Sequence, residues 1–213
     1  MDADTFVAAV EHDAATELDR LGSEKFLVAA TEADLSATAV LRAAARSEAA
    51  ARDTFDAWAA EERDAAAREA FAATATRESD HHDRVVAALD GGAEPPSDAT
   101  PDPMHEHLRE VTGTIERVGA GLVGRPLVAD RTLLQVVNFF VNEADPARAD
   151  LFRDLRADTA ETRARGATLL EERCEADADW ERAREAATAV IRVAYEDYAD
   201  TLDGMGLDPR PLC

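Results

Sequence analysis

Three side chains in the first half of the chain have the types and the spacing of metal ligands. Glu78 and His81 stand three residues apart, so both side chains lie on the same face of an α-helix. Glu48 lies earlier in the chain, within the apolar stripe of its own helical pattern. Burying a carboxylate is costly unless a cation compensates it, and in helical bundles a Glu facing a Glu-x-x-His pair commonly holds a metal ion. This pattern predicts a metal site between two helices.

Each of these residues also has an interpretation without a metal. Glu48 is followed four residues later by Arg52, so the two side chains can form an ion pair along one helix at the edge of a bundle. Glu78 and His81 can form a buried, hydrogen-bonded pair that needs no ion. The sequence leaves these alternatives open.

The residues around the three candidates predict two helices joined by a tight turn. Residues 37–62 carry apolar side chains at steps of three and four, and a second stripe with the same spacing runs from a turn at Arg63-Asp64 to about residue 89. A short connection between two facing stripes is typical of an antiparallel hairpin of helices. The lone Glu and the Glu-x-x-His pair would then face each other across the hairpin.

Residues 37–90 resemble the rubrerythrins, a branch of the ferritin-like superfamily. The first helix is similar to the family pattern of a ligand Glu, an Arg four residues on and an aromatic residue seven residues on. The second is similar to the pattern of an aromatic residue followed by Glu-x-x-His. The residues that carry the resemblance are Glu48, Arg52, Phe55, Phe71, Glu78 and His81.

This resemblance implies an all-α, ferritin-like four-helix bundle with additional N- and C-terminal helices. It implies that Glu48, Glu78 and His81 are ligands of a carboxylate-bridged pair of iron ions, with manganese as the alternative metal. The implied activity is redox chemistry on peroxide or oxygen, that is, a non-haem di-iron oxidoreductase or peroxidase. Nothing in the sequence identifies an electron donor.

The chain departs from the family in its second half. No Glu-x-x-His occurs after residue 89, and the cysteines of the family's rubredoxin-like module are missing. The best remaining candidates for further ligands are Glu143, Glu196 and, from the N-terminal helix, Glu17. The alternative function is therefore a ferritin-like protein without a metal, acting as a structural or protein-interaction protein.

The rest of the chain is organised around one break in composition. Residues 91–103 contain two glycines and four prolines and are predicted to be a linker. It separates residues 1–90, with the N-terminal helices and the helical hairpin, from residues 104–213, whose helices complete or extend the bundle. In this second half we expect a helix from residue 104 to about 122 and a break over residues 121–126. A strongly buried helix over 132–141 and a last helix over 180–202 are expected to follow.

The composition indicates an acidic, halophilic protein. The chain has 45 acidic and 23 basic residues, a formal net charge of −22, and a single lysine, Lys25. In molar salt the screening length falls to roughly 3 Å, so this surface charge is tolerated. It argues against nucleic acid and anionic membranes as partners. The acidic N-terminus and the absence of a long apolar segment predict a cytoplasmic protein, and the Ala-rich helix faces predict a homodimer.

Overall fold

The computed structural model describes residues 1–89 and 102–210, and no strand occurs among them. The fold is all-α, as the composition predicts. None of the described helices is long and apolar enough to cross a membrane. In chain order the helices are α1 (Ala3–Asp13), α2 (Ala15–Leu21), α3 (Lys25–Ala30), α4 (Ala37–Glu61), α5 (Ala65–Ala87), α6 (Pro103–Glu110), α7 (Thr114–Gly119), the π-helical turn η1 (Ala120–Gly124), α8 (Arg125–Asn142), α9 (Pro146–Arg173) and α10 (Asp177–Gly204).

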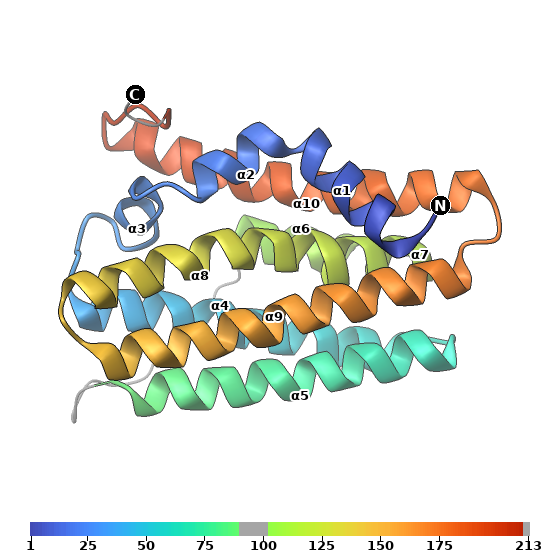
Figure 1. Cartoon of the computed structure of the whole chain (residues 1–213), viewed down its shortest axis with the longest axis horizontal. Helices are drawn as coiled ribbons and strands as arrows, with labels where there is room; N and C mark the ends of the chain where they lie inside the picture. The colour runs from blue at the N-terminus through green and yellow to red at the C-terminus, as the bar shows by residue number, and fades with distance from the viewer. Residues whose placement is uncertain (90–101, 211–213) are drawn as a thin grey trace.

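Helices α4 and α5 form the hairpin that the periodicity predicts. The side chain of Ser36 accepts a hydrogen bond from the first turn of α4, and Asp64 accepts two from the first turn of α5, which satisfies backbone groups that a helix start leaves free. Only three residues separate the two helices, so they pack antiparallel along their length (Figure 1). The hairpin sets the register between Glu48 and the Glu-x-x-His pair.

A second hairpin, α8–α9, packs against the first. Pro146 occupies the first turn of α9, where its missing N–H costs nothing, and begins the return helix. Apolar side chains from α4, α5, α8 and α9 meet in one buried cluster, within which the rings of Phe140 and Phe152 stack. These four helices form a bundle, and α10 lies along it together with α1 and α2 (Figure 1).

The helical path from residue 104 differs from the prediction at two places. The helix is interrupted between α6 and α7 at Gly113, whose φ of 90° is not helical. It then runs without a break from Thr114 to Asn142, so the break expected over 121–126 is wrong. Pro126 removes a helical hydrogen bond and crowds the preceding turn. The wider π turn over Ala120–Gly124 comes directly before it and accommodates it.

The predicted linker, residues 91–103, falls outside the described residues except for its last two. Asp102 caps α6, accepting a hydrogen bond from the backbone N–H of His105, and Pro103 is the first residue of that helix. This cap has a second role, because Asp102 also contacts the side chain of His105.

Glycine in the π turn allows α10 to approach the bundle closely. A Cβ at Gly124 would lie 2.6 Å from the backbone oxygen of Ala187 on α10. Gly124→Ala is therefore expected to lower the free energy of unfolding by about 1–3 kcal/mol, because the two backbones must separate. This loss would occur although alanine is the better helix former by about 1 kcal/mol. Chemical denaturation followed by circular dichroism measures the change.

The matched control is Gly204→Ala in the last turn of α10, where nothing lies within 4 Å of the added Cβ. That variant is expected to be as stable as the wild type or slightly more so. Equal stability of the Gly124 and Gly204 variants would contradict the close approach of the two helices.

Candidate metal centre

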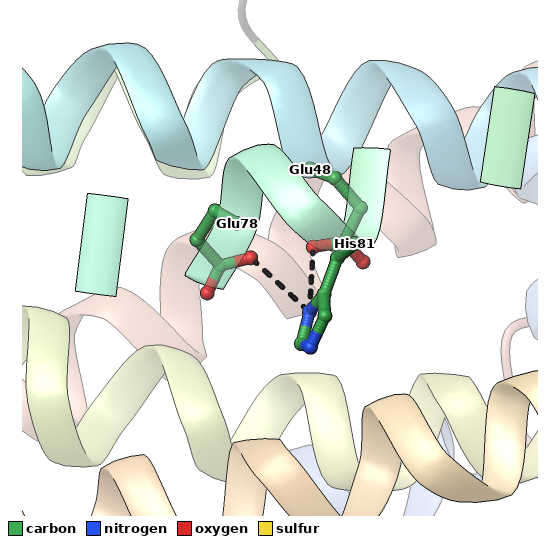
Figure 2. Close-up of side chains that lie close together, drawn as sticks. All are labelled: Glu48, Glu78 and His81. Atoms are coloured by element: carbon green, nitrogen blue, oxygen red, sulfur yellow. Dashed lines mark ion pairs between the residues drawn. The ribbon is translucent and has the colours of Figure 1, made fainter. Parts of the chain in front are cut away.

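The hairpin brings Glu48, Glu78 and His81 together in the interior. All three residues are at most 5 % exposed. One ligand atom from each lies within 4.8 Å of the others, and no other such group of three or more occurs among the residues that the structure describes. Nδ1 of His81 lies 3.7 Å from Oε2 of Glu48 and 3.8 Å from Oε2 of Glu78 (Figure 2). The close grouping expected from the sequence is therefore present.

The two ring nitrogens of His81 have different surroundings. Nε2 lies 3.1 Å from a carboxylate oxygen of Asp158 on α9, and Nδ1 faces the two glutamates. A histidine that donates one N–H to a carboxylate presents the lone pair of its other nitrogen, which is the arrangement found for metal-bound histidines. A lone pair facing two carboxylates is repelled unless a proton or a cation lies between them. The geometry therefore requires a proton or a cation at this point.

The pKa of His81 is consistent with that requirement. Burial alone would lower it, but the contact with Glu48 and the negative charges of Glu48 and Glu78 raise it above its ordinary value. Without a metal, the ring would thus hold a second proton more readily than a free histidine. Proton and metal ion are alternative occupants of the same lone pair.

A buried arginine completes the cluster from the second hairpin. Arg125, the first residue of α8, is 3 % exposed. Its Nη1 and Nη2 donate hydrogen bonds of 2.9 Å and 3.2 Å to the two carboxylate oxygens of Glu78, and Nη2 lies 3.7 Å from Oε2 of Glu48. This two-point contact is the strongest form of an arginine–carboxylate pair. Arg125 thus supplies one positive charge to the two buried glutamates.

The third nitrogen of Arg125 is held by a fixed histidine. Nε of Arg125 donates to Nε2 of His105 at 3.3 Å, and Nδ1 of His105 lies 2.9 Å from Asp102. Because Nε2 accepts, the proton of a neutral His105 sits on Nδ1 and is donated to Asp102. Burial would raise the pKa of Asp102, but the hydrogen bond to His105 keeps it below its ordinary value. A buried polar chain therefore runs from α6 through Arg125 to the hairpin.

The two glutamates hold one proton between them at neutral pH. Burial, together with the charge of Glu48, raises the pKa of Glu78 to about 8, in spite of the opposing charge of Arg125. Burial would also raise the pKa of Glu48, but its contacts with Glu78 and His81 and the charge of Arg125 lower it to about 2. Two carboxyls in one buried site cannot both ionise freely.

The other candidate ligands lie elsewhere. Glu143 is exposed just after α8, Glu196 is exposed on α10, and Glu17 is half-buried on α2. The structure does not bring any of them into the group of Glu48, Glu78 and His81. These positions follow from helix ends and helix faces that turn toward solvent. They leave the cluster with three ligand side chains.

The ion pair between Glu48 and Arg52 that the sequence allows is not formed. Arg52 binds its neighbour Asp53 instead, at 2.7 Å on the surface. Glu48 faces inward and Arg52 is partly exposed, so the two side chains leave the helix in different directions. The charge on Glu48 is therefore compensated from other helices.

Sequence reasoning missed four members of the cluster: Arg125, His105, Asp102 and Asp158. One signal was available for Arg125, which is the only charged residue in the otherwise apolar run from residue 118 to residue 129. A lone charge within such a run is expected to be buried and paired. Asp158 has no comparable signal, because it lies in a helix rich in acidic and basic residues.

Comparison with known proteins adds no assignment. No protein-family model matches the chain, and no curated protein and no solved structure is significantly similar to it. The function is therefore inferred from the geometry of the cluster.

Proposed function

We propose that this chain is a ferritin-like helical protein that binds a single divalent metal ion through Glu48, Glu78 and His81. The observation that carries the proposal is the orientation of His81, whose Nε2 contacts Asp158 while Nδ1 faces two carboxylates. Two carboxylates and one imidazole are ligands that suit Fe(II) and Mn(II). The packing of hairpin α8–α9 on hairpin α4–α5 supports the ferritin-like arrangement.

The surroundings of Glu78 favour one ion over two. Arg125 donates to both oxygens of Glu78, so this carboxylate cannot bridge two metal ions without giving up that pair. Among the described residues no second group of ligands lies near the first. We therefore propose a site with one ion in place of the iron pair that the resemblance implies.

The residues fit a site that controls a redox-active ion. An Fe(II) ion bound here would supply one electron toward the reduction of peroxide or oxygen, the activity that the resemblance implies, and an external reductant would supply the others. Asp158 orients His81, Arg125 offsets the charge of Glu78, and the packed helices leave the three ligand residues almost fully buried. Each of these roles follows from a contact of this chain.

A second candidate function is a metal-free structural protein. It is favoured by the same Arg125, which already neutralises one of the two glutamates, together with the single proton that the pair retains. In that case the cluster is a buried network that joins the two hairpins. Metal binding separates the two candidates.

Elemental analysis of protein purified in high salt without chelator and then loaded anaerobically with Fe(II) is the test. We expect about one ion per chain in the wild type and almost none in His81→Ala, since a structural or catalytic site loses its ion with a ligand. Glu143→Ala, which changes an exposed glutamate, is the matched control and should keep the ion. Two ions per chain would contradict the single-ion site. A wild-type protein without any bound ion would contradict the metal site and favour the metal-free structural function.

A further inference from the structure

A cavity of about 240 Å³ opens beside the cluster, on the side of Glu48 and Arg125. It lies between one face of α4 and one face of α8. On α4 the lining residues follow helical spacing from Val40 through Ala44 to Glu48, and on α8 from Arg125 through Ala129 to Val136. Small side chains in the middle of both faces, such as Ala44 and Ala129, leave the space unfilled. The exposed side chain of Arg46 also belongs to the lining, so the cavity reaches the surface.

The body of the cavity is apolar, and its polar groups include a buried acceptor. Leu27, Val40, Leu133 and Val136 supply apolar walls. Glu48 is 95 % buried and interacts with Glu78, while its cationic neighbours, on His81 and Arg125, are both 3.7 Å away, beyond the usual range of about 2.7–3.2 Å for such a hydrogen bond. A carboxylate can accept about four hydrogen bonds, so Glu48 keeps acceptor positions for a ligand. An apolar pocket with a few converging polar groups is the usual form of a small-molecule site.

Arg125 adds donors to the same end. A guanidinium has five N–H groups, and the contacts to Glu78 and His105 account for three of them. Two N–H groups remain on a side chain that is almost fully buried and lines the cavity. The polar end therefore presents an acceptor, Glu48, and a donor, Arg125, within 3.7 Å of each other. A hydroxyl group both donates and accepts and can satisfy the two together.

The charged side chains at the cavity disfavour a ligand whose polar group carries a charge. Glu48, Asp102 and Asp197 line it beside Arg46 and Arg125, and Arg125 is already paired with Glu78. An anionic ligand would therefore meet more negative than positive side chains. An ammonium group would meet Arg125 and leave its free N–H groups without an acceptor. The volume also limits the body of the ligand: a cavity of about 150 Å³ holds one benzene ring, so 240 Å³ suits a single ring with a short substituent or a short alkyl chain.

We infer that this cavity binds a compact neutral alcohol, with its hydroxyl between Glu48 and Arg125 and its apolar body between α4 and α8. The inference goes beyond the proposed metal site and does not depend on a bound ion, because the cavity and both polar groups belong to the protein alone. Its test uses chelator-treated protein, so a failure of metal binding leaves the result unaffected.

Calorimetric titration with four probes of one shape tests the inference: benzyl alcohol, toluene, benzylamine and benzoate. Benzyl alcohol is expected to bind, and the three others at least about tenfold more weakly, since each lacks a hydrogen bond or places a charge against a like charge. Binding of none of the four would overturn the inference. Toluene or benzylamine binding as tightly as the alcohol would also overturn it, because the hydroxyl would then not be recognised.

Cavity-filling variants locate the binding. Ala129→Leu on α8 and Ala44→Leu on α4 fill the space from opposite walls, so one remains informative if the other fails to fold. Each folded variant is expected to bind benzyl alcohol at least about tenfold more weakly, because its leucine occupies the place of the ligand. Ala72→Leu, at an exposed position of α5, is the matched control and should bind as the wild type does. Unchanged binding in both cavity variants would show that the alcohol binds elsewhere and would overturn the inference.

Discussion

Arg125→Met is expected to lower the free energy of unfolding of the metal-free protein by about 3–5 kcal/mol, the usual cost of removing one partner of a buried ion pair. The variant leaves Glu78 without the two hydrogen bonds at 2.9 Å and 3.2 Å, and it leaves His105 without a donor. Methionine keeps much of the apolar volume, so the loss reports the charge and not a cavity. Denaturant unfolding in the presence of chelator measures it.

Arg153→Met is the matched control for this prediction. Arg153 forms an ion pair with Asp150 on the surface, at 2.6 Å, where such a pair contributes about 0–1 kcal/mol. A loss of the same small size in Arg125→Met would contradict the role of Arg125 as the compensating charge.

The double variant Arg125→Met/Glu78→Gln identifies the source of the loss. Removing the negative partner as well is expected to recover a large part of the stability, since Glu48 is then the one carboxylate left in the cluster and His81 lies beside it to compensate its charge. A double variant as unstable as the sum of the two single variants would show that Arg125 acts through packing alone.

The stability of the metal-free protein is expected to fall as the pH rises from about 5 to about 8, by up to about 1 kcal/mol per pH unit. Burial raises the pKa of Glu78 from 4.5 to about 8, so above pH 4.5 the unfolded chain releases a proton that the folded chain retains. The contribution of Glu78 is therefore fully present below the unfolded value and is lost as the pH rises through the folded one. His81, whose pKa is also raised, acts in the same direction.

Glu48 changes the stability with pH in the opposite direction from Glu78, and it does so at lower pH. Its pKa falls from 4.5 to about 2, so its contribution is present above pH 4.5 and is lost as the pH falls toward 2. The two glutamates alone therefore give a maximum of stability near pH 4.5. Denaturation on both sides of this pH, at constant high salt, measures the profile.

Glu78→Gln is the control for the pH profile, because it removes the titrating group and keeps the shape. In this variant we expect the free energy of unfolding to change clearly less between pH 5 and 8 than in the wild type, whatever its absolute stability. Saturating Mn(II) is expected to flatten the slope of the wild type as well, since a metal ion binds the deprotonated ligands and stabilises the folded chain more at higher pH. If the stability of the metal-free wild type instead rose between pH 5 and 8, the two glutamates would not share a proton.

Local spacing was sufficient for the hairpin and for its three ligand candidates. Glu78 and His81 share a face because they stand three residues apart, and the stripe of the preceding helix places Glu48 opposite them. Both relations depend on helix geometry and on one short turn, and for that reason the printed sequence was enough to predict them. The structure has the two helices of this hairpin, α4 and α5, within one or two residues of the predicted ends.

Only the tertiary structure decided what compensates the buried charges. Arg125 reaches Glu78 from 47 residues away, and Asp158 reaches His81 from 77 residues away. No periodicity within one helix links residues so far apart, because their approach depends on how the second hairpin packs against the first. The same packing explains why Pro126 does not break its helix, since a π turn at the contact with α10 accommodates it. The sequence by itself therefore determined an all-α chain with a Glu, Glu, His cluster, while the arginine beside that cluster and the cavity next to it arise from the packing of helices distant in sequence.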